Sequence, residues 1–358
     1  MSTTRRRQYV LGGKGPDGLR TVSTVVTISA TARIAKATRA VRNESPSPGA
    51  FARWRARIIR VHTSPPVTRV DDPLVRDVLR WYAANARDLP WRRAEASPWA
   101  VLVSEIMLQQ TPVARVLPAY ERWLRRWPAP ADLAAEEPGE AVRAWDRLGY
   151  PRRALRLHAA ARAMVAEHGG RVPDSYQALL ALPGVGDYTA AAVASFAFRR
   201  RHVVLDTNVR RVLSRSLAGE ARPAPAPTAA ERRRAETLLP ADGATAARWA
   251  VAAMEFGALV CTARTPGCDR CPVRRRCAWR AAGFPDDGGR RRTQRYDGTD
   301  RQARGRLLRV LREAPASVPG DALAAAWDDA GQRARALDGL VADGLVEPLA
   351  GDRYRLPR

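Results

Sequence analysis

Lysine is almost missing from this sequence. Of its 61 lysine and arginine residues, only Lys14 and Lys36 are lysines. Apart from four histidines, every basic side chain after Lys36 is therefore an arginine, whose guanidinium stays protonated at neutral pH. Reactions that form a Schiff base between a substrate and a lysine amine are excluded from the body of the chain for this reason.

Long apolar runs are missing as well. No stretch reaches the roughly 18 consecutive apolar residues of a membrane span. The N-terminus is charged and lacks the continuous apolar segment that is typical of a signal peptide. We therefore expect no membrane partner and a cytoplasmic location.

Cysteine is absent except in one short segment, Cys261-x6-Cys268-x2-Cys271-x5-Cys277. Thiols gathered in this way favour a metal centre over a packed core, and four thiolates suit a [4Fe–4S] cluster or a tetrahedral zinc ion. Zinc ribbons usually carry two C-x2-C pairs, and only Cys268 and Cys271 are so spaced. The pattern therefore predicts a [4Fe–4S] cluster, with zinc and disulfides as the alternatives.

The net charge is +25, which favours a polyanionic partner such as DNA or RNA. Residues 1–70 hold fourteen of the basic residues and two acids and lack periodicity, so we predict a disordered basic extension. Arginines also surround the cysteines. Arg264, between Cys261 and Cys268, is the best candidate for a phosphate contact.

Helical periodicity begins at Asp72-Pro73, which is typical of a capped helix start. It recurs over residues 98–110, 112–126, 139–147, 152–168, 175–182, 187–199, 207–217, 228–239 and 244–260. Strand-like alternation is nearly absent there, so the predicted fold class is all-α. Residues 286–299 are predicted to form a linker. Residues 300–358 suggest three short helices and a hairpin that turns at Gly351-Asp352, an order compatible with a winged helix.

The segment Leu182-Pro183-Gly184-Val185-Gly186 lies between two predicted helices. Two glycines allow a tight turn whose N–H groups open outward, and the following helix adds its positive N-terminal end. This pattern favours a helix-hairpin-helix that binds DNA phosphates, and an ordinary helix–helix turn is the alternative.

Two carboxylates differ in their expected surroundings. Glu105 lies in an apolar helix, where burial is expected to raise its pKa. Asp206 precedes a helix as an N-cap, where backbone N–H groups favour the ionised form. An acid and a base with diverging pKa values are typical of glycosidic bond cleavage. Taken singly, Asp206 is also explained as an ordinary cap, and Glu105 as a buried core carboxyl.

These motifs occur together and in order, with Ser104-Glu105-Ile106-Met107-Leu108-Gln109-Gln110-Thr111 before the hairpin and Leu205-Asp206-Thr207-Asn208-Val209 before the cysteines. The chain resembles the MutY adenine DNA glycosylase branch of the helix-hairpin-helix superfamily, whose sister is endonuclease III. The resemblance covers residues 72–285. It implies a central helical barrel at 99–205, a cluster domain built from 72–98 and 206–285, and an active site in the cleft between them.

The resemblance also implies roles for single residues. Glu105 is expected to protonate N7 of adenine, and Asp206 to stabilise the oxocarbenium-like sugar, with Tyr188 and Asn208 supporting this pair. Gln110 is expected to insert into the base stack and Tyr150 to wedge beside 8-oxoguanine. The walls of the adenine pocket are expected to be Trp91, Arg92, Leu108 and Glu255.

The implied function is monofunctional removal of adenine opposite 8-oxoguanine or guanine in double-stranded DNA, by a monomer. One alternative is endonuclease III-like glycosylase and lyase action, which needs a lysine where this chain has Tyr188. Another is a non-catalytic iron–sulfur protein that binds DNA. Two features depart from the family pattern. Pro151-Arg152-Arg153 follows Tyr150, where many relatives have a second tyrosine and an alanine, and residues 300–358 do not resemble the Nudix-like domain that recognises 8-oxoguanine in many relatives.

Overall fold

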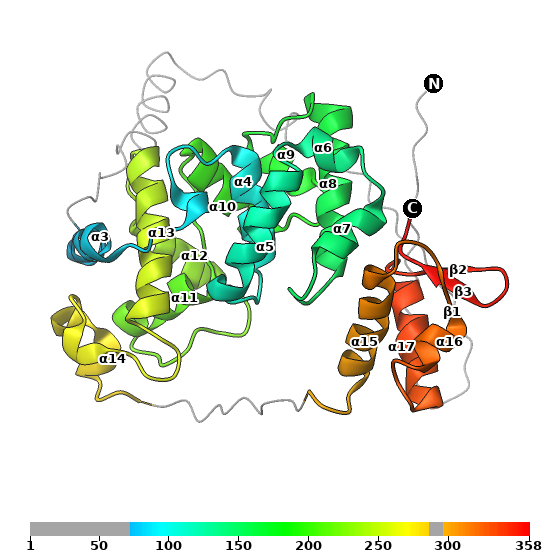
Figure 1. Ribbon diagram of the computed structural model, residues 1–358. Helices are drawn as coiled ribbons and strands as arrows, with labels where there is room; N and C mark the ends of the chain where they lie inside the picture. Colours follow the sequence, from blue (N-terminus) through cyan, green and yellow to red (C-terminus); the bar gives the residue numbers. More distant parts are fainter. Residues whose placement is uncertain (1–71, 286–295) are drawn as a thin grey trace, which may run out of the picture. The chain divides into compact units, whose positions relative to one another are not determined.

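The computed structural model describes residues 72–285 and 296–358 (Figure 1). The extension predicted for residues 1–70, and residues 286–295 of the predicted linker, lie outside the described residues. Helices dominate the described chain, and its strands fall within residues 318–355. The predicted all-α class is confirmed. No helix among the described residues is both long and apolar enough to span a bilayer.

The first described helix, α3 (Pro73–Asn85), begins at the predicted cap. Oδ1 of Asp72 accepts a hydrogen bond from the backbone N of Leu74 at 2.9 Å. Pro73 occupies the first helical position, where a backbone N–H has no intrahelical partner to lose. A single 3-10 turn, η2 (Pro90–Arg92), follows and places Trp91 and Arg92 beside the central helices.

The central helices are α4 (Pro98–Leu108), α5 (Val113–Arg126), α6 (Pro130–Ala134), α7 (Pro138–Ala144), α8 (Arg152–His168), α9 (Tyr176–Ala181) and α10 (Asp187–Phe198). Helix α4 ends two residues before its predicted end, because the backbone turns at Gln110, where φ is 54°. The five-residue α6 was not predicted, since it is too short to show a helical period.

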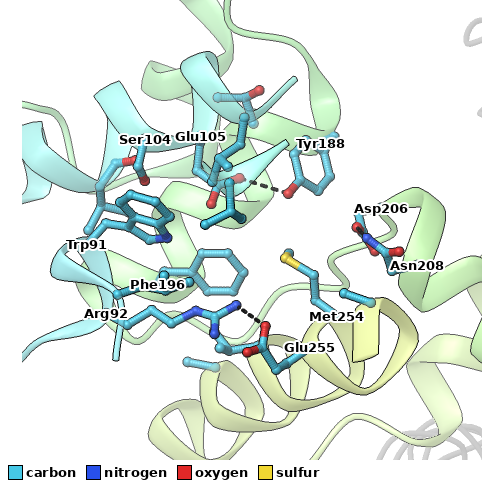
Figure 2. A pocket seen from close by; sticks show the side chains of 18 of the residues that line it. Trp91, Arg92, Ser104, Glu105, Tyr188, Phe196, Asp206, Asn208, Met254 and Glu255 are labelled. Atoms are coloured by element: carbon cyan, nitrogen blue, oxygen red, sulfur yellow. Dashed lines mark hydrogen bonds and ion pairs between the residues drawn. The ribbon is translucent and has the colours of Figure 1, made fainter. Parts of the chain in front are cut away.

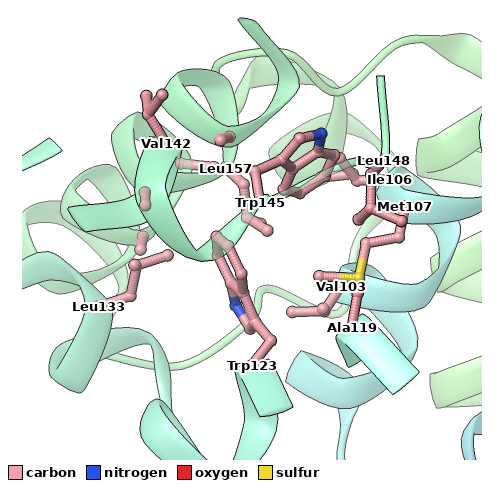
Figure 3. Packing of buried hydrophobic residues seen from close by; sticks show 14 of the residues in the cluster. Val103, Ile106, Met107, Ala119, Trp123, Leu133, Val142, Trp145, Leu148 and Leu157 are labelled. Atoms are coloured by element: carbon pink, nitrogen blue, oxygen red, sulfur yellow. The ribbon is translucent and has the colours of Figure 1, made fainter. Parts of the chain in front are cut away.

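A large hydrophobic core surrounds α4. Trp123 packs edge-to-face against Trp127 and Trp145, with ring centroids 4.6 and 5.6 Å apart. Figure 3 shows Trp123 and Trp145 together with Met107 of α4 and Leu157 of α8 in this core. Such aromatic pairs add roughly 0.5–1.5 kcal/mol each beyond their buried area. The helix that carries Glu105 is therefore held in a rigid frame.

A second hydrophobic cluster joins α3 to three later helices, α11 (Thr207–Leu213), α12 (Ala229–Thr237) and α13 (Gly243–Leu259). A π-helical turn, η3 (Ser214–Ala218), continues α11, where the sequence predicted one helix over 207–217. The hydroxyl of Ser216 donates to the carbonyl of Val212 at 2.6 Å, and such bonds compete with the regular backbone pattern.

The cysteine segment follows α13 as short turns. These are η4 (Cys268–Arg270), η5 (Arg274–Arg276) and α14 (Ala278–Ala281). Local backbone hydrogen bonds close these turns, such as the bond from the N–H of Arg274 to the carbonyl of Cys271 at 3.2 Å.

The C-terminal part contains α15 (Asp300–Glu313), β1 (Val318–Pro319), α16 (Gly320–Ala324), α17 (Ala330–Ala342), β2 (Glu347–Leu349) and β3 (Arg353–Arg355). The strands form an antiparallel sheet in the order β1-β3-β2, with Val318 and Pro348 both opposite Tyr354. The β2–β3 hairpin turns at Gly351 and Asp352, both with positive φ. The two-residue strand β1 was not predicted, because it is too short to alternate.

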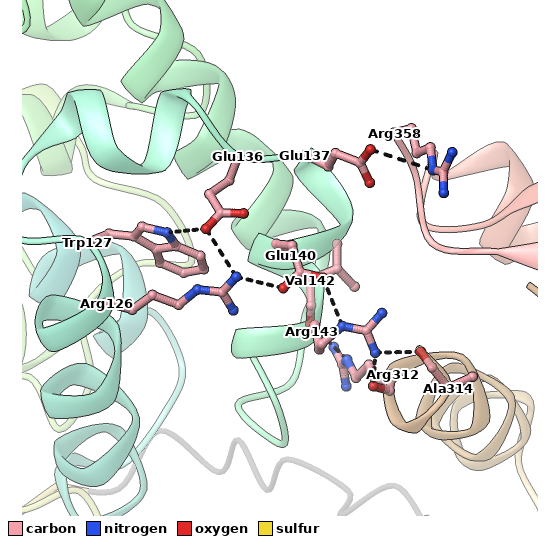
Figure 4. A network of polar contacts seen from close by, with 10 residues as sticks. All are labelled: Arg126, Trp127, Glu136, Glu137, Glu140, Val142, Arg143, Arg312, Ala314 and Arg358. Atoms are coloured by element: carbon pink, nitrogen blue, oxygen red, sulfur yellow. Dashed lines mark hydrogen bonds and ion pairs between the residues drawn. The ribbon is translucent and has the colours of Figure 1, made fainter. Parts of the chain in front are cut away.

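Polar contacts join the C-terminal part to α7, as Figure 4 shows, and also to the turn after that helix. Arg312 of α15 donates to the carbonyl oxygens of Val142 at 2.9 Å and Asp146 at 2.6 Å. Arg143 of α7 donates to the carbonyl of Ala314 at 2.8 Å. At the surface, Arg358 pairs with Glu137 at 3.6 Å. The C-terminal part thus holds the turn that leads to Tyr150.

Candidate active site

A cleft of about 1620 Å³ collects most of the side chains that the sequence singles out. Its lining includes Trp91, Arg92, Glu105, Leu108, Gln110, Gly184, Gly186, Tyr188, Asp206, Asn208 and Glu255. Tyr150, Arg264 and the four cysteines are not among the lining residues. Elements from both hydrophobic clusters build the cleft, with α4 and α10 from one and α13 and the start of α11 from the other.

Glu105 lies on α4 and is 5% exposed (Figure 2). Its Oε2 accepts a hydrogen bond from the hydroxyl of Tyr188 at 2.8 Å. Burial raises the pKa of Glu105 to about 7, the Tyr188 hydrogen bond opposes this rise, and the nearby charge of Asp206 adds to it. The predicted direction for this pKa is therefore supported by the geometry, and the carboxyl is partly protonated at neutral pH.

Asp206 caps α11, as the sequence suggests. Its Oδ1 accepts from the backbone N of Val209 at 2.6 Å, and its Oδ2 accepts from Nδ2 of Asn208 at 2.7 Å. The expectation that the cap keeps this pKa low was wrong. Burial in the cleft raises the pKa of Asp206, and the hydrogen bonds from Val209 and Asn208 only oppose that rise.

The amide of Asn208 has a fixed orientation. Arg211 donates to Oδ1 of Asn208 at 2.7 Å and to the carbonyl of Gly257 at 2.6 Å. The amide nitrogen is thereby left to face Asp206. Gly257 is required here, because a Cβ at this position would lie 2.8 Å from Cβ of Asn208.

Glu255 on α13 is fully buried and ionised. Arg87 donates to both of its oxygens at 2.6 Å, and Arg92 donates to Oε2 at 3.0 Å. Burial alone would raise the pKa of Glu255, but the bonds and charges of these arginines outweigh it and lower the pKa to about 2. The site thus offers an acceptor-only carboxylate beside Arg92 and Trp91.

Sequence reasoning missed three residues of this site. Phe196 and Met254 lie between Arg92 and Asp206 in Figure 2 and give the cleft an apolar face. Arg87 was missed although it holds Glu255. Helical spacing marks Phe196 and Met254 only as core positions, and 168 residues separate Arg87 from Glu255, so no local pattern could have revealed them.

The Leu182–Gly186 segment forms a tight turn between α9 and α10 at the cleft. Gly184 has φ of +77°, and a Cβ there would meet Arg156 at 2.5 Å, so both conformation and space require glycine. A Cβ at Gly186 would meet nothing within 4 Å, which leaves the backbone before α10 accessible. This geometry fits a phosphate contact at the N-terminus of a twelve-residue helix.

Gln110 and Tyr150 share an unusual backbone conformation. Both have positive φ, 54° and 46°, although neither is glycine. Both residues are exposed, and Tyr150 is 57% exposed. Exposed side chains on a strained backbone favour a binding role over packing.

The four cysteines form no disulfide and line one small cavity with the apolar side chains of Val212, Phe256 and Val273. Arg215 donates toward Sγ of Cys261 at 3.6 Å. Four thiols, apolar walls and a cationic neighbour fit the donor set of an iron–sulfur cluster. As they are placed in this structure, no three or more His, Cys, Asp or Glu side chains within residues 72–285 and 296–358 form a group that could hold a metal ion.

Comparisons with known proteins place the chain among DNA repair enzymes. Residues 103–237 match the model of the HhH-GPD superfamily of base excision DNA repair proteins. The chain is similar to an adenine DNA glycosylase of Mycobacterium tuberculosis, with 51% identity over 283 residues, 78% of this chain and 92% of that protein. It is also similar to one of Mycolicibacterium smegmatis, with 51% identity over 281 residues, 78% of this chain and 94% of that protein.

A solved endonuclease III in a non-covalent complex with DNA shares the fold, with a TM-score of 0.51 and 21% identity over 59% of this chain and 95% of that one. The predicted helix-hairpin-helix fold is thereby confirmed. Given these similarities and their coverage, the chain belongs to the adenine DNA glycosylase family of the HhH-GPD superfamily.

Proposed function

We propose that the chain removes adenine paired with 8-oxoguanine or guanine from duplex DNA and leaves the strand uncut. As a member of its family, the chain is an adenine DNA glycosylase of base excision repair, a hydrolase of N-glycosyl bonds. The observation that carries the finer proposal is the pair of Glu105 and Asp206 in one cleft, with different hydrogen-bond partners.

Glu105 is the proton donor in this proposal. The Tyr188 hydroxyl binds Oε2, so Oε1 is the oxygen that carries the transferable proton to N7 of adenine. A pKa of about 7 leaves roughly half of the carboxyls protonated at neutral pH, which suits a general acid. Protonation of N7 turns adenine into a neutral leaving group.

Asp206 acts on the sugar. Its two oxygens are held in place by Val209 and Asn208. A carboxylate that is fixed and partly desolvated stabilises a developing positive charge far more strongly than one in water. Asp206 thus stabilises the oxocarbenium-like sugar, or bonds to it transiently, while water completes the hydrolysis.

The extruded adenine is held by Trp91, Arg92, Leu108 and Glu255, with Phe196 and Met254 as apolar faces. The ionised Glu255 accepts hydrogen bonds only, which suits the exocyclic amine of adenine. Base extrusion costs a few kcal/mol of lost stacking. Gln110 and Tyr150 compensate by inserting into the duplex, with Tyr150 on the 8-oxoguanine side.

The remaining DNA contacts are to phosphate. The turn at Gly184 and Gly186 offers backbone N–H groups, and Arg264 is exposed between Cys261 and Cys268. We propose that the four thiolates hold a [4Fe–4S] cluster, which fixes the Arg264 loop for binding. The protein is proposed to act as a monomer at the bacterial nucleoid.

Endonuclease III-like lyase action is disfavoured by the amino acid at position 188. A lyase needs an amine there, and the tyrosine instead holds Glu105. A non-catalytic DNA-binding role is disfavoured by the raised pKa of Glu105, since a buried carboxyl without a function is costly.

A duplex assay tests the proposal. Duplexes with adenine opposite 8-oxoguanine, guanine, cytosine or thymine are compared under single turnover, with alkali treatment and borohydride trapping as parallel arms. We expect excision opposite 8-oxoguanine and guanine, strand breaks only after alkali, and no stoichiometric trapped complex. Equal excision from all four pairs, or a stoichiometric trapped complex in a chain lacking residues 1–70, would refute the proposal.

A further inference from the structure

Arg153 is a charged residue at the base of the two exposed segments that carry Gln110 and Tyr150. It lies in the first turn of α8 and is only 6% exposed. NH1 donates to the carbonyl oxygens of Ile106 at 2.8 Å and Gln109 at 2.6 Å, at the end of α4. One half of the guanidinium therefore holds the Gln110 segment.

The other half holds the Tyr150 segment. NH2 donates to the carbonyl of Gly149 at 3.1 Å and to the hydroxyl of Thr111 at 3.1 Å. The guanidinium carbon also lies 5.4 Å from the ring centroid of Tyr150, within the range of a cation–π interaction. One side chain thus bridges the residues directly before Tyr150 and those on both sides of Gln110.

Both bridged segments need support. A left-handed backbone costs a non-glycine residue about 1–2 kcal/mol, and Gln110 and Tyr150 both adopt it. Strained conformations persist only where the surroundings hold them. The hydrogen bonds of Arg153 fall on these segments, directly beside the two strained positions.

Burial of the Arg153 guanidinium is energetically unfavourable, which argues against a purely structural role. The hydrogen-bond partners of Arg153 in the described chain are carbonyl and hydroxyl oxygens, and its buried Nε has none there. Burial lowers the pKa of Arg153 to about 10. A buried cation without a carboxylate is unfavourable unless its hydrogen bonds serve a purpose that an apolar side chain would not.

We propose that Arg153 is a positioning residue that sets the spacing and orientation of Gln110 and Tyr150, so that both side chains enter the duplex together when adenine is extruded. This inference rests on the proposed function. The planar guanidinium suits the task, because its nitrogens point to two segments at once. A lysine ammonium at the same position is a point donor that reaches one segment or the other.

The test is a double-mutant cycle on single-turnover excision of adenine opposite 8-oxoguanine. Arg153→Lys is made in the wild-type chain and in a Gln110→Ala/Tyr150→Ala chain. Arg201→Lys is the matched control, because Arg201 also donates to backbone carbonyls, those of Leu239 and Pro240, and lies outside the lining of the cleft.

We expect Arg153→Lys to slow excision between about tenfold and a hundredfold in the wild-type chain, as small misplacements do. In the Gln110→Ala/Tyr150→Ala chain it should have little further effect, because the side chains through which it acts are gone. Arg201→Lys should leave the rate unchanged in both. An equal loss from Arg153→Lys in both chains would overturn the proposal.

A binding measurement gives a readout that does not depend on chemistry. In a Glu105→Gln background, a 2-aminopurine beside the mispair reports unstacking by its fluorescence. We expect Arg153→Lys to reduce the rise in fluorescence on binding. An unchanged rise would contradict the proposal. A wild-type chain that excises no adenine at all would instead refute the proposed function, so the two failures are distinguishable.

If Arg153→Lys fails to fold, Thr111→Val decides the matter. This isosteric change removes the Oγ1 acceptor of Arg153 and keeps the volume of the side chain. We expect a smaller loss of excision that again disappears in the Gln110→Ala/Tyr150→Ala chain. A loss of the same size in both chains would overturn the proposal.

Discussion

The hydroxyl of Tyr188 on α10 donates a hydrogen bond to Oε2 of Glu105 on α4 at 2.8 Å. The bond joins two residues that are 83 positions apart in the sequence and that both line the cleft. It occupies one carboxyl oxygen, opposes the effect of burial on the pKa, and leaves the other oxygen for the substrate. Tyr188 therefore lowers the pKa of Glu105 and orients its carboxyl group.

The pH dependence of excision follows from this pair. Glu105 must be protonated, so kcat should fall as the pH rises through about 7. Asp206 must be ionised, so kcat should also fall on the acidic side. Tyr188→Phe removes a bond that lowers the pKa of Glu105, so its basic limb should move to higher pH. A basic limb that moves to lower pH, or does not move, would contradict this account.

Glu105 should also lower the free energy of unfolding at alkaline pH. Its pKa rises from 4.5 to about 7 on folding, which corresponds to about 3 kcal/mol at pH 8. Because the folded pKa is the higher one, the contribution of Glu105 to stability is most favourable below pH 4.5 and is lost as the pH rises through 7. Glu105→Gln should therefore raise the free energy of unfolding at pH 8 by about 2–3 kcal/mol and have little effect at pH 4. Denaturant unfolding at both pH values checks this, and equal effects at both would contradict it.

Purified protein should be brown and contain about four irons and four sulfides per chain, as four thiolates around one cubane imply. Cys271→Ala should lower the iron content and weaken DNA binding by the adjacent loop. Elemental analysis and visible absorbance after anaerobic preparation provide the measurement. One equivalent of zinc per chain and no visible absorbance would show that the four cysteines bind zinc, and would contradict the cluster proposal.

Deletion of residues 300–358 tests how 8-oxoguanine is recognised. Arg312 holds the carbonyl of Asp146, at the start of the turn that leads to Tyr150. We expect deletion to slow excision opposite 8-oxoguanine by about tenfold, or about 1.4 kcal/mol, and excision opposite guanine much less.

A milder pair of variants separates this role from non-specific binding. Arg312→Ala should reproduce the selective loss, whereas Arg358→Ala, which breaks only the surface pair with Glu137, should not. An equal loss on both mispairs that low salt reverses would assign the C-terminal part to phosphate contacts alone.

Local signals explain what the sequence could predict. Glu105 stands out because its sequence neighbours are apolar, and these same neighbours form the buried α4. The cap at Asp206 follows from a pattern of four residues. Its pKa direction does not, because burial of the carboxyl in the folded cleft outweighs the local hydrogen bonds.

The remaining features depend on contacts between distant segments. In the sequence, Arg153 is indistinguishable from a surface arginine at the start of a helix. Its burial is evident only in the folded structure, where the C-terminal end of α4 and the 146–150 turn surround it. Arg87 is similar, since its partner Glu255 is far away in the sequence. The short elements α6 and β1 carry too few residues for a period to be read.

Glu105→Gln tests the central claim most directly. The variant keeps the size of the side chain and an acceptor for Tyr188 but has no acidic proton to deliver. Single-turnover excision of adenine opposite 8-oxoguanine and duplex affinity by gel shift are measured side by side with the wild type. We predict that excision falls at least about a thousandfold while affinity for the mispair stays within a few-fold. Excision near the wild-type rate would remove Glu105 from the chemistry and contradict the account.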